Sequence, residues 1–200
     1  MKDDNKKMKN YRNKMKDPKD RLYHQTPLKI LSFLSRYPEK IFSEREIQNA
    51  TRASICSVNQ TLKLLLELDI VTRERKGNVF LYQINSANFL LKYFKIFENL
   101  LYIYDFVKEI KPYASEIVLY GSCAKGENNE DSDIDIFIKT EYKAKVRKIV
   151  NKYRIREDKL KAVILDPLEI ASSKKSDEVF YNEIKKGIVL WRGKPTYEEV

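Results

Sequence analysis

The sequence is poor in the residues that build cross-linked or metal-stabilised domains: its 200 residues contain two cysteines and one histidine. Cys56 and Cys123 lie far apart, so we expect no disulfide framework, and the cysteines and histidine do not make a zinc-binding set. No apolar run approaches the ~18 residues of a membrane span, and no apolar stretch follows the basic N-terminus. These absences predict a protein of a reducing, cytoplasmic setting with no membrane partner.

Positive charge is unevenly distributed along the chain. The net charge is +10; residues 1–24 carry nine Lys or Arg against four Asp, whereas residues 91–200 carry 21 basic and 19 acidic residues. We interpret residues 1–24 as a basic, flexible arm. Such an arm beside a small domain suits a polyanion such as DNA or RNA, although a solvated, lysine-rich tail explains the composition equally well.

Residues 26–84 show the pattern of a compact helical domain that ends in a hairpin. We expect a first helix with Pro27 in its first turn, a second helix opened by the capping box Ser43–Glu46, and a third helix capped by Ser54. Segments 70–75 and 79–84 predict two strands joined by a Gly-containing turn. The third helix has an apolar face formed by Ile55, Val58, Leu62 and Leu65.

This order of three helices and a hairpin resembles the winged helix-turn-helix family. The resemblance implies that the third helix enters the major groove of double-stranded DNA and that the hairpin, or wing, touches the phosphate backbone. A winged helix used for dimerisation or protein contact is the alternative. The residues that the resemblance would place at DNA are Ser57, Asn59, Gln60, Lys63, Arg73, Arg75 and Lys76.

Residues 86–110 are rich in large apolar residues at helical spacing and contain neither Gly nor Pro. We expect a long connecting helix, or two, before Pro112. The apolar residues exceed what one small core needs, so a homodimer through residues 88–107 is plausible. Burial against the two flanking domains is the more ordinary explanation.

A Gly-Ser turn and an Asp-x-Asp pair carry the clearest chemical signal. Gly121 and Ser122 follow the apolar segment 116–120, which predicts a buried strand, and ten intervening residues separate them from Asp133 and Asp135. The alternation after Asp133 predicts a second strand with both carboxylates and Phe137 on one side. Its core side would be formed by Ile134, Ile136 and Ile138.

These residue types suit the binding of a nucleoside triphosphate and its metal. A glycine lets the backbone approach a phosphate closely, and a serine adds a hydroxyl. Two carboxylates on one strand face supply the hard oxygen ligands that Mg²⁺, or Mn²⁺ in its place, requires. Two ions about 4 Å apart would stabilise the attacking and leaving oxygens of a nucleotidyl transfer.

The segment resembles the nucleotidyltransferase superfamily that includes DNA polymerase beta, especially its minimal branch, over roughly residues 100–193. That resemblance implies a mixed sheet flanked by helices, with Asp133 and Asp135 as catalytic metal ligands. The residues that match its motif are Gly121, Ser122, Lys125, Gly126, Glu127, Ser132, Asp133 and Asp135. Among them, Gly121, Ser122, Lys125 and Ser132 would bind the nucleotide.

One expected residue is missing. Active members of the superfamily carry a third carboxylate on the next core strand, but segment 160–165 contains no acid near Lys161 or Val163, where it should lie. Asp158 and Asp166 flank that strand, and each lies about 10 Å along the strand from the expected position. The sequence therefore leaves open whether the domain turns over substrate.

We expect an α+β protein with a basic arm (1–24), a winged helix-turn-helix domain (25–86), a connecting helix (87–112) and a nucleotidyltransferase domain (113–200). The expected function is Mg²⁺-dependent transfer of a nucleoside monophosphate from a nucleoside triphosphate to a hydroxyl, with a protein as one possible acceptor. The alternative is a DNA-binding transcriptional regulator whose second domain senses nucleotide or is inactive.

Overall fold

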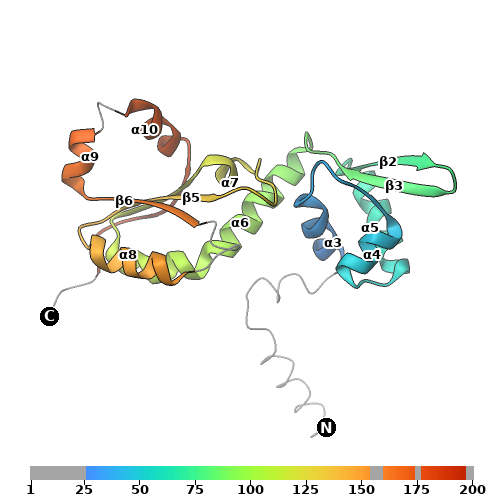
Figure 1. Cartoon of the computed structure of the whole chain (residues 1–200), viewed down its shortest axis with the longest axis horizontal. Helices are drawn as coiled ribbons and strands as arrows, with labels where there is room; N and C mark the ends of the chain where they lie inside the picture. Colours follow the sequence, from blue (N-terminus) through green and yellow to red (C-terminus); the bar gives the residue numbers. More distant parts are fainter. Residues whose placement is uncertain (1–25, 154–159, 174–176, 197–200) are drawn as a thin grey trace, which may run out of the picture. The chain divides into compact units, whose positions relative to one another are not determined.

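The computed structural model describes residues 26–153, 160–173 and 177–196, and the chain divides into two compact units, Met1–Asn88 and Phe89–Val200. Figure 1 shows both units as mixtures of helices and strands. The helices within the described ranges are each too short or too polar to cross a membrane.

The described part of the first unit, from residue 26 onward, contains three helices and a three-stranded antiparallel sheet in the order β1-β3-β2. Its elements are α3 (Thr26–Ser35), β1 (Ile41–Ser43), α4 (Glu44–Thr51), α5 (Ile55–Glu67), β2 (Val71–Lys76) and β3 (Val79–Ile84). The three helices and the hairpin predicted from the sequence are therefore present, in the predicted order. Strand β1, which pairs with β3, was not predicted.

The helix starts in this unit follow their local sequence signals. The Ser43 hydroxyl accepts from the Glu46 N–H and the Glu46 carboxylate accepts from the Ser43 N–H, so the predicted capping box is confirmed. Ser54 caps α5 by accepting from the Ser57 N–H. Val58, Leu62 and Leu65 of α5 are buried as predicted, but Ile55 is exposed because it occupies the first turn, beyond the edge of the core.

The second unit is built on a four-stranded mixed sheet in the order β6-β5-β4-β7, in which only β5 and β6 are parallel. Its helices are α6 (Phe89–Ile110), the 3-10 turn η1 (Lys111–Tyr113), α7 (Gly121–Lys125), α8 (Lys143–Lys152), α9 (Pro167–Ser173) and α10 (Glu178–Lys185). Its strands are β4 (Glu116–Tyr120), β5 (Ile134–Lys139), β6 (Leu160–Leu165) and β7 (Ile188–Arg192).

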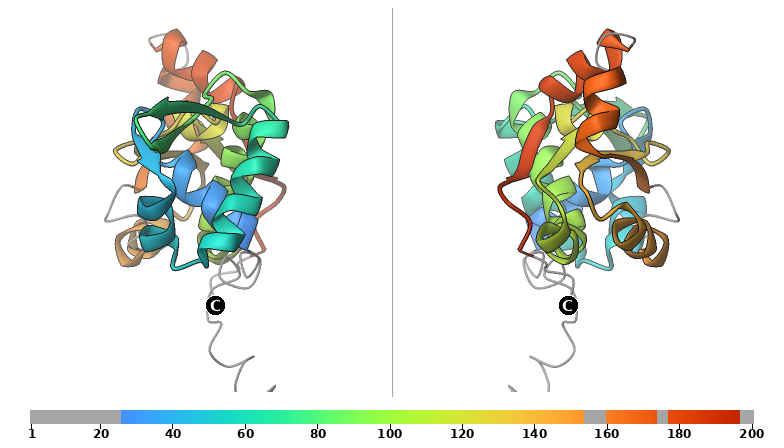
Figure 2. Two further views of the ribbon diagram at one scale, coloured as in Figure 1. Left: turned by 90° about the vertical axis from the view of Figure 1, so that its right-hand side faces the viewer. Right: turned by 90° about the vertical axis from the view of Figure 1, so that its left-hand side faces the viewer.

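Both faces of this sheet are covered. Helices α6 and α8 lie over one face, and α9 and α10 lie over the other (Figures 1 and 2). Ile134, Ile136 and Ile138 are fully buried under α6 and α8, as their alternation predicted. The opposite face is not left to solvent, because Phe137 is buried against Tyr181 and its neighbours in a second, smaller cluster. The two carboxylates predicted from the motif therefore lie on the face that α9 and α10 cover.

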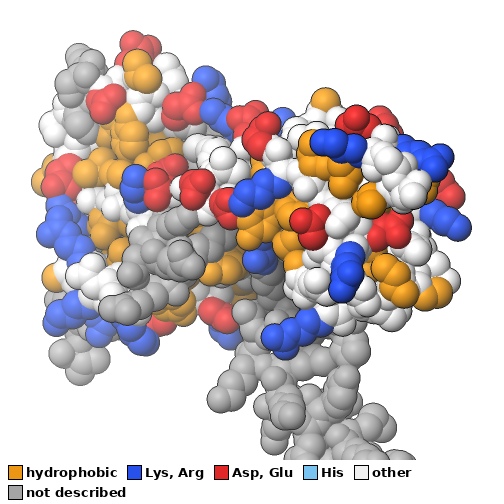
Figure 3. Space-filling model, turned by 45° about the vertical axis from the view of Figure 1, so that its right-hand side comes forward, with side chains coloured by type: hydrophobic (Ala, Val, Ile, Leu, Met, Phe, Trp, Pro, Cys, Tyr) orange, Lys and Arg blue, Asp and Glu red, His pale blue; other side chains and the backbone are white. Residues whose placement is uncertain are grey.

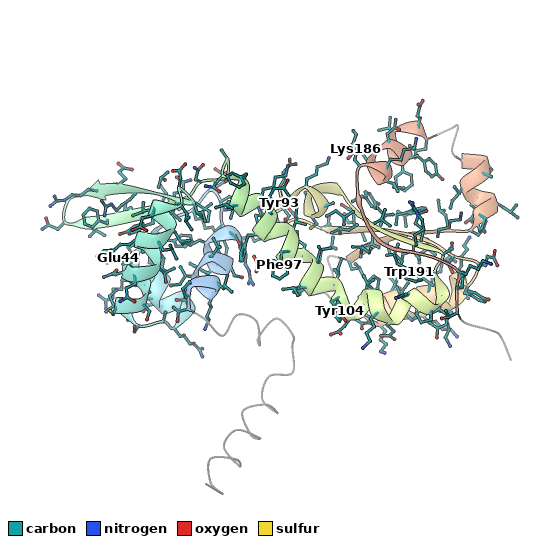
Figure 4. All side chains as sticks on the ribbon, turned by 180° about the vertical axis from the view of Figure 1, so that it is seen from behind. Glu44, Tyr93, Phe97, Tyr104, Lys186 and Trp191 are labelled. Carbon is teal, nitrogen blue, oxygen red and sulfur yellow. The ribbon has the colours of Figure 1, made fainter. Side chains whose placement is uncertain are left out.

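Helix α6 belongs to the second unit and buries one face against the sheet, including Ile103 and Phe106. A row of aromatic side chains on the same helix is exposed, including Tyr93, Phe97 and Tyr104 (Figure 4). Their spacing places them on one stripe of the helix. The homodimer predicted from this segment stays a prediction, which sedimentation at micromolar concentration would test.

Candidate functional site

The Gly-Ser turn and the Asp-x-Asp pair are brought into contact by the pairing of β4 with β5. Tyr120 lies opposite Asp135 in the antiparallel register, so the turn that follows β4 begins beside this carboxylate. Gly121 has a φ of +70°, and a Cβ added there would lie 2.6 Å from Asp135 Oδ2. Glycine is therefore required at this position for two reasons, the left-handed backbone conformation and the close approach of the Asp135 carboxylate.

Asp133 directly precedes β5 and Asp135 is the second residue of that strand, so this spacing of two directs both side chains to the same side of the sheet. Burial raises the pKa of the Asp135 carboxyl, the neighbouring Asp133 charge raises it further, and the Lys161 ammonium opposes both effects. Burial and the nearby Asp135 charge also raise the pKa of the Tyr120 phenol. The pair is thus a partly buried concentration of negative charge, which is the arrangement that a bound cation relieves.

A lysine supplies a cation at this pair. Strand β6 runs parallel to β5 with Lys161 opposite Asp135, and the Lys161 Nζ lies 2.6 Å from Asp133 Oδ2. The Asp133 carboxylate raises the pKa of the Lys161 ammonium, chiefly through their hydrogen bond. Sequence reasoning identified Lys161 only as a position that lacks an acid, because the register between β5 and β6 is not encoded in a local pattern.

Of the two acids that flank β6, the structure describes Asp166, and this residue does not take the missing position. Asp166 lies past the far end of β6, where its carboxylate accepts from the Glu169 N–H at the start of α9 and pairs with Lys143. The Glu169 carboxylate in turn accepts from the Asp166 N–H and contacts the same lysine. Asp166 therefore caps a helix at the opposite end of the strand from Asp135. Asp158 lies outside the described residues.

The other residues predicted to bind nucleotide lie around the same turn, with partners of their own. The Lys125 Nζ, at the end of α7, donates to Glu183 of α10 at 2.9 Å, and this bond raises the pKa of the lysine. The Ser132 hydroxyl donates to the Asn129 side chain and accepts from its N–H, which closes the loop before Asp133. Ser122 is partly exposed in α7, directly after Gly121.

A buried polar network that sequence reasoning missed supports the site from α6. The fully buried Asn99 donates to the Cys123 carbonyl and to the Asn128 side chain, both at 2.9 Å. The Cys123 thiol donates to the Asp133 carbonyl at 3.2 Å, so it is a packing and hydrogen-bonding residue here. Gly126, at φ +69°, packs against the Lys92 carbonyl of the same helix. An asparagine inside an apolar helical run was the one sequence signal for this network.

The donor set limits the metal that the site can hold. Among residues 26–153, 160–173 and 177–196, no group of three or more His, Cys, Asp or Glu side chains could hold a metal ion. Mg²⁺ is commonly held by one or two carboxylates together with substrate phosphates and water. Asp133 and Asp135 therefore fit one such ion completed by a triphosphate, and they do not form a metal site by themselves.

The residues predicted to contact DNA lie on two elements of the first unit. Gln60 and Lys63 are exposed on α5, whereas Ser57 and Asn59 are only partly exposed there. The Asn59 Oδ1 atom is buried and has no hydrogen-bond partner. The remaining three predicted residues lie exposed along β2 and are Arg73, Arg75 and Lys76.

The basic residues of the hairpin are ordered by an aromatic ring. The guanidinium carbon of Arg73 lies 4.5 Å from the centre of the Phe80 ring, and that of Arg75 lies 6.0 Å from it. Arg75 also donates to the Gly77 carbonyl at the turn. On the face of the first unit seen in Figure 3, basic side chains are mixed with acidic and hydrophobic ones rather than forming one continuous patch.

Comparison with known proteins bears on the second unit. Residues 100–189 match the family model described as the nucleotidyltransferase domain. The mixed sheet flanked by helices is consistent with that domain, and the match agrees with the resemblance carried by the Gly-Ser and Asp-x-Asp residues. The family match does not extend to residues 26–84, so the winged helix stays a prediction.

One similar solved structure is a candidate nucleotidyltransferase from Sulfolobus solfataricus. It is 20% identical to this chain, with a TM-score of 0.37, and the alignment covers 54% of this chain and 93% of that chain. No curated protein matches the sequence.

Proposed function

We propose that this protein is a nucleotidyltransferase that transfers a nucleoside monophosphate from a nucleoside triphosphate to a hydroxyl group. The observation that carries the proposal is the contact between the Gly-Ser turn and the Asp-x-Asp pair, in which Gly121 leaves no room for a side chain beside Asp135. The match of residues 100–189 to the nucleotidyltransferase domain supports the same reading.

In the proposed reaction, the acceptor hydroxyl oxygen forms a bond to the α-phosphorus and the bond to the pyrophosphate oxygen breaks. Gly121 and Ser122 position the phosphates through the backbone and a hydroxyl, and Lys125 and Ser132 lie on the segments that flank them. Asp133 and Asp135 would hold Mg²⁺ or Mn²⁺. When bound, the ion neutralises charge on the triphosphate and the departing pyrophosphate. The hydroxyl proton leaves to a carboxylate of the site or to water.

The test is label transfer. The protein is incubated with each α-labelled nucleoside triphosphate, Mg²⁺ or Mn²⁺ and a cell extract that supplies protein and nucleic-acid acceptors. We expect a labelled product from the parent and none from Asp133→Ala/Asp135→Ala. Asp105→Ala, which removes an exposed aspartate from α6 away from these residues, serves as the matched control. Equal labelling by parent and double variant would reject the site assignment.

A second function is favoured by the Lys161–Asp133 pair and by the absence of a third carboxylate among the described residues. In this proposal the chain is a transcriptional regulator, the first unit is a winged helix that binds double-stranded DNA, and the second unit senses nucleotide without turning it over. Residues Arg73 and Arg75 support it, because cationic side chains held by an aromatic ring at the edge of a hairpin suit a phosphate backbone.

Gel-shift titration of genomic DNA fragments separates the two functions. We expect Arg73→Ala/Arg75→Ala to weaken DNA binding and to reduce its salt dependence, since each lost phosphate contact lowers the slope by about 0.9. Lys29→Ala, which removes an exposed cation from α3, is the control. DNA binding that survives Asp133→Ala/Asp135→Ala, with no label transferred by the parent, favours the regulator. Absence of DNA binding by the parent protein would refute the regulator proposal.

A further inference from the structure

The Asp133 carboxylate is already neutralised by a side chain of the protein. The Lys161 Nζ lies 2.6 Å from Asp133 Oδ2, a distance at which the ammonium donates a charge-assisted hydrogen bond to this oxygen. The parallel register with Asp135 fixes where Lys161 starts on β6, on the same side of the sheet as both carboxylates. The sheet therefore fixes the backbone position from which the Lys161 side chain reaches Asp133.

This pair is open to exchange. The side chains of Lys161 and Asp133 keep 66% and 37% of their accessible surface, so water and ions reach both. Ion pairs this exposed are weak, because water screens the attraction and holding a long side chain costs entropy. A stronger competitor for Asp133 can displace the ammonium, but a lone divalent cation must also overcome repulsion from it.

We propose that Lys161 takes the place of a metal ion at Asp133 in the free protein and so keeps the affinity of the site for divalent cations low. This inference rests on the proposed role of Asp133 and Asp135 as metal ligands, but it does not require catalysis. It assigns to Lys161 the control of metal affinity, a role that neither the sequence motif nor the family match gives to that position.

Binding of Mn²⁺ in the absence of nucleotide tests the proposal. Free Mn²⁺ is measured by electron paramagnetic resonance during titration of the parent, Lys161→Met and Lys161→Glu. We expect weak binding by the parent and a Kd lower by on the order of tenfold for Lys161→Met, because a unit charge beside a solvent-exposed ion acts at this scale. Lys161→Glu adds a third carboxylate on the same side of the sheet and should bind more tightly still.

Two controls make the result specific. Lys148→Met and Lys148→Glu change the charge of the same unit by the same amounts at an exposed position on α8, and they should bind Mn²⁺ as the parent does. Adding Asp135→Asn to Lys161→Glu should abolish the gain. A gain that persists in that double variant, or an equal gain in the Lys148 variants, overturns the assignment.

A second readout is thermal stability, since a ligand that binds only the folded state raises the melting temperature. Mn²⁺ should raise the Tm of Lys161→Glu and leave the parent unchanged, and chelation should not lower the Tm of the parent. Tight binding of Mn²⁺ by the parent protein in the absence of nucleotide refutes the proposal. Lys161→Met, which removes only an exposed ammonium, decides the question if Lys161→Glu does not fold. Because no nucleotide is present, failure here is distinct from failure of label transfer.

Discussion

Replacing Gly121 by alanine should disturb the site more than the fold. Alanine in the left-handed region costs about 1–2 kcal/mol, and the new Cβ would lie 2.6 Å from Asp135 Oδ2, closer than carbon and oxygen can approach. The carboxylate must rotate away, at a cost on the order of 1 kcal/mol for an unfavourable rotamer. We expect Gly121→Ala to destabilise the second unit by about 2–3 kcal/mol, or roughly 10 °C in Tm.

A natural fluorescent probe reports on the unfolding of this unit. Its single tryptophan, Trp191, lies in β7 of the second unit and donates from its indole N–H to the Ala114 carbonyl. Urea titration followed by tryptophan fluorescence therefore reports the unfolding of the unit that contains Gly121. Binding of a fluorescent nucleoside triphosphate with Mg²⁺ is measured in parallel, and it should be lost at temperatures where Gly121→Ala remains folded.

Two comparisons separate the clash from the backbone strain. Gly77 has a φ of +64° and nothing lies within 4 Å of an added Cβ. Gly77→Ala therefore loses stability only through the left-handed backbone conformation, and circular dichroism measures that loss. In an Asp135→Ala background, Gly121→Ala should cost about 1 kcal/mol less than in the parent, because the displaced oxygen is gone. Equal costs in the two backgrounds, with nucleotide binding intact, would refute the contact between Gly121 and Asp135.

Three further changes follow from the same geometry. Asp135→Asn should raise the Tm at neutral pH, because the raised pKa of Asp135 means that folding disfavours its charged form. The parent should therefore lose stability relative to the variant as the pH rises through that pKa. A stability difference that stays constant across the pH range would contradict this prediction. Asn99→Leu should cost about 1–3 kcal/mol in urea unfolding, because it leaves the buried Asn128 amide without its partner, whereas no loss would show that the network is dispensable. Glu183→Gln should release the Lys125 ammonium from its ion pair and so lower the Kd for a nucleoside triphosphate, measured by fluorescence. An unchanged Kd would show that Lys125 does not assist phosphate binding.

Local sequence signals predicted those parts of the fold that local physics determines. The capping box at Ser43 depends on residues three positions apart, and the buried isoleucines of β5 follow from the two-residue period of a strand. Both are present as predicted. The exposure of Ile55 could not be predicted in this way, because the periodicity of a helix does not reveal where the neighbouring core ends.

The parts of the site that the sequence did not reveal depend on strand register. Lys161 and Asp133 are 28 positions apart along the chain, and only the parallel alignment of β5 with β6 brings them together. The same alignment separates Asp166 from Asp135: counted along the chain, Asp166 is a near neighbour of the expected acid position, yet it lies beyond the opposite end of the strand. Pairing partners of this kind are set by the packing of the whole sheet.

The charge of the site bears directly on the two proposed functions. Two aspartates and one lysine give the carboxylate cluster a formal charge of −1, whereas three carboxylates at the same strands would give −3. A cluster of −3 favours two divalent cations, which together stabilise both the attacking and the leaving oxygen. A cluster with a charge of −1 can retain only one divalent cation, and the triphosphate must supply further ligands to that ion. One ion suffices to hold a triphosphate, but it leaves the acceptor hydroxyl without the second cation. The residue at position 161 therefore influences nucleotide binding less than it influences turnover, and Lys161→Glu should shift the balance toward label transfer.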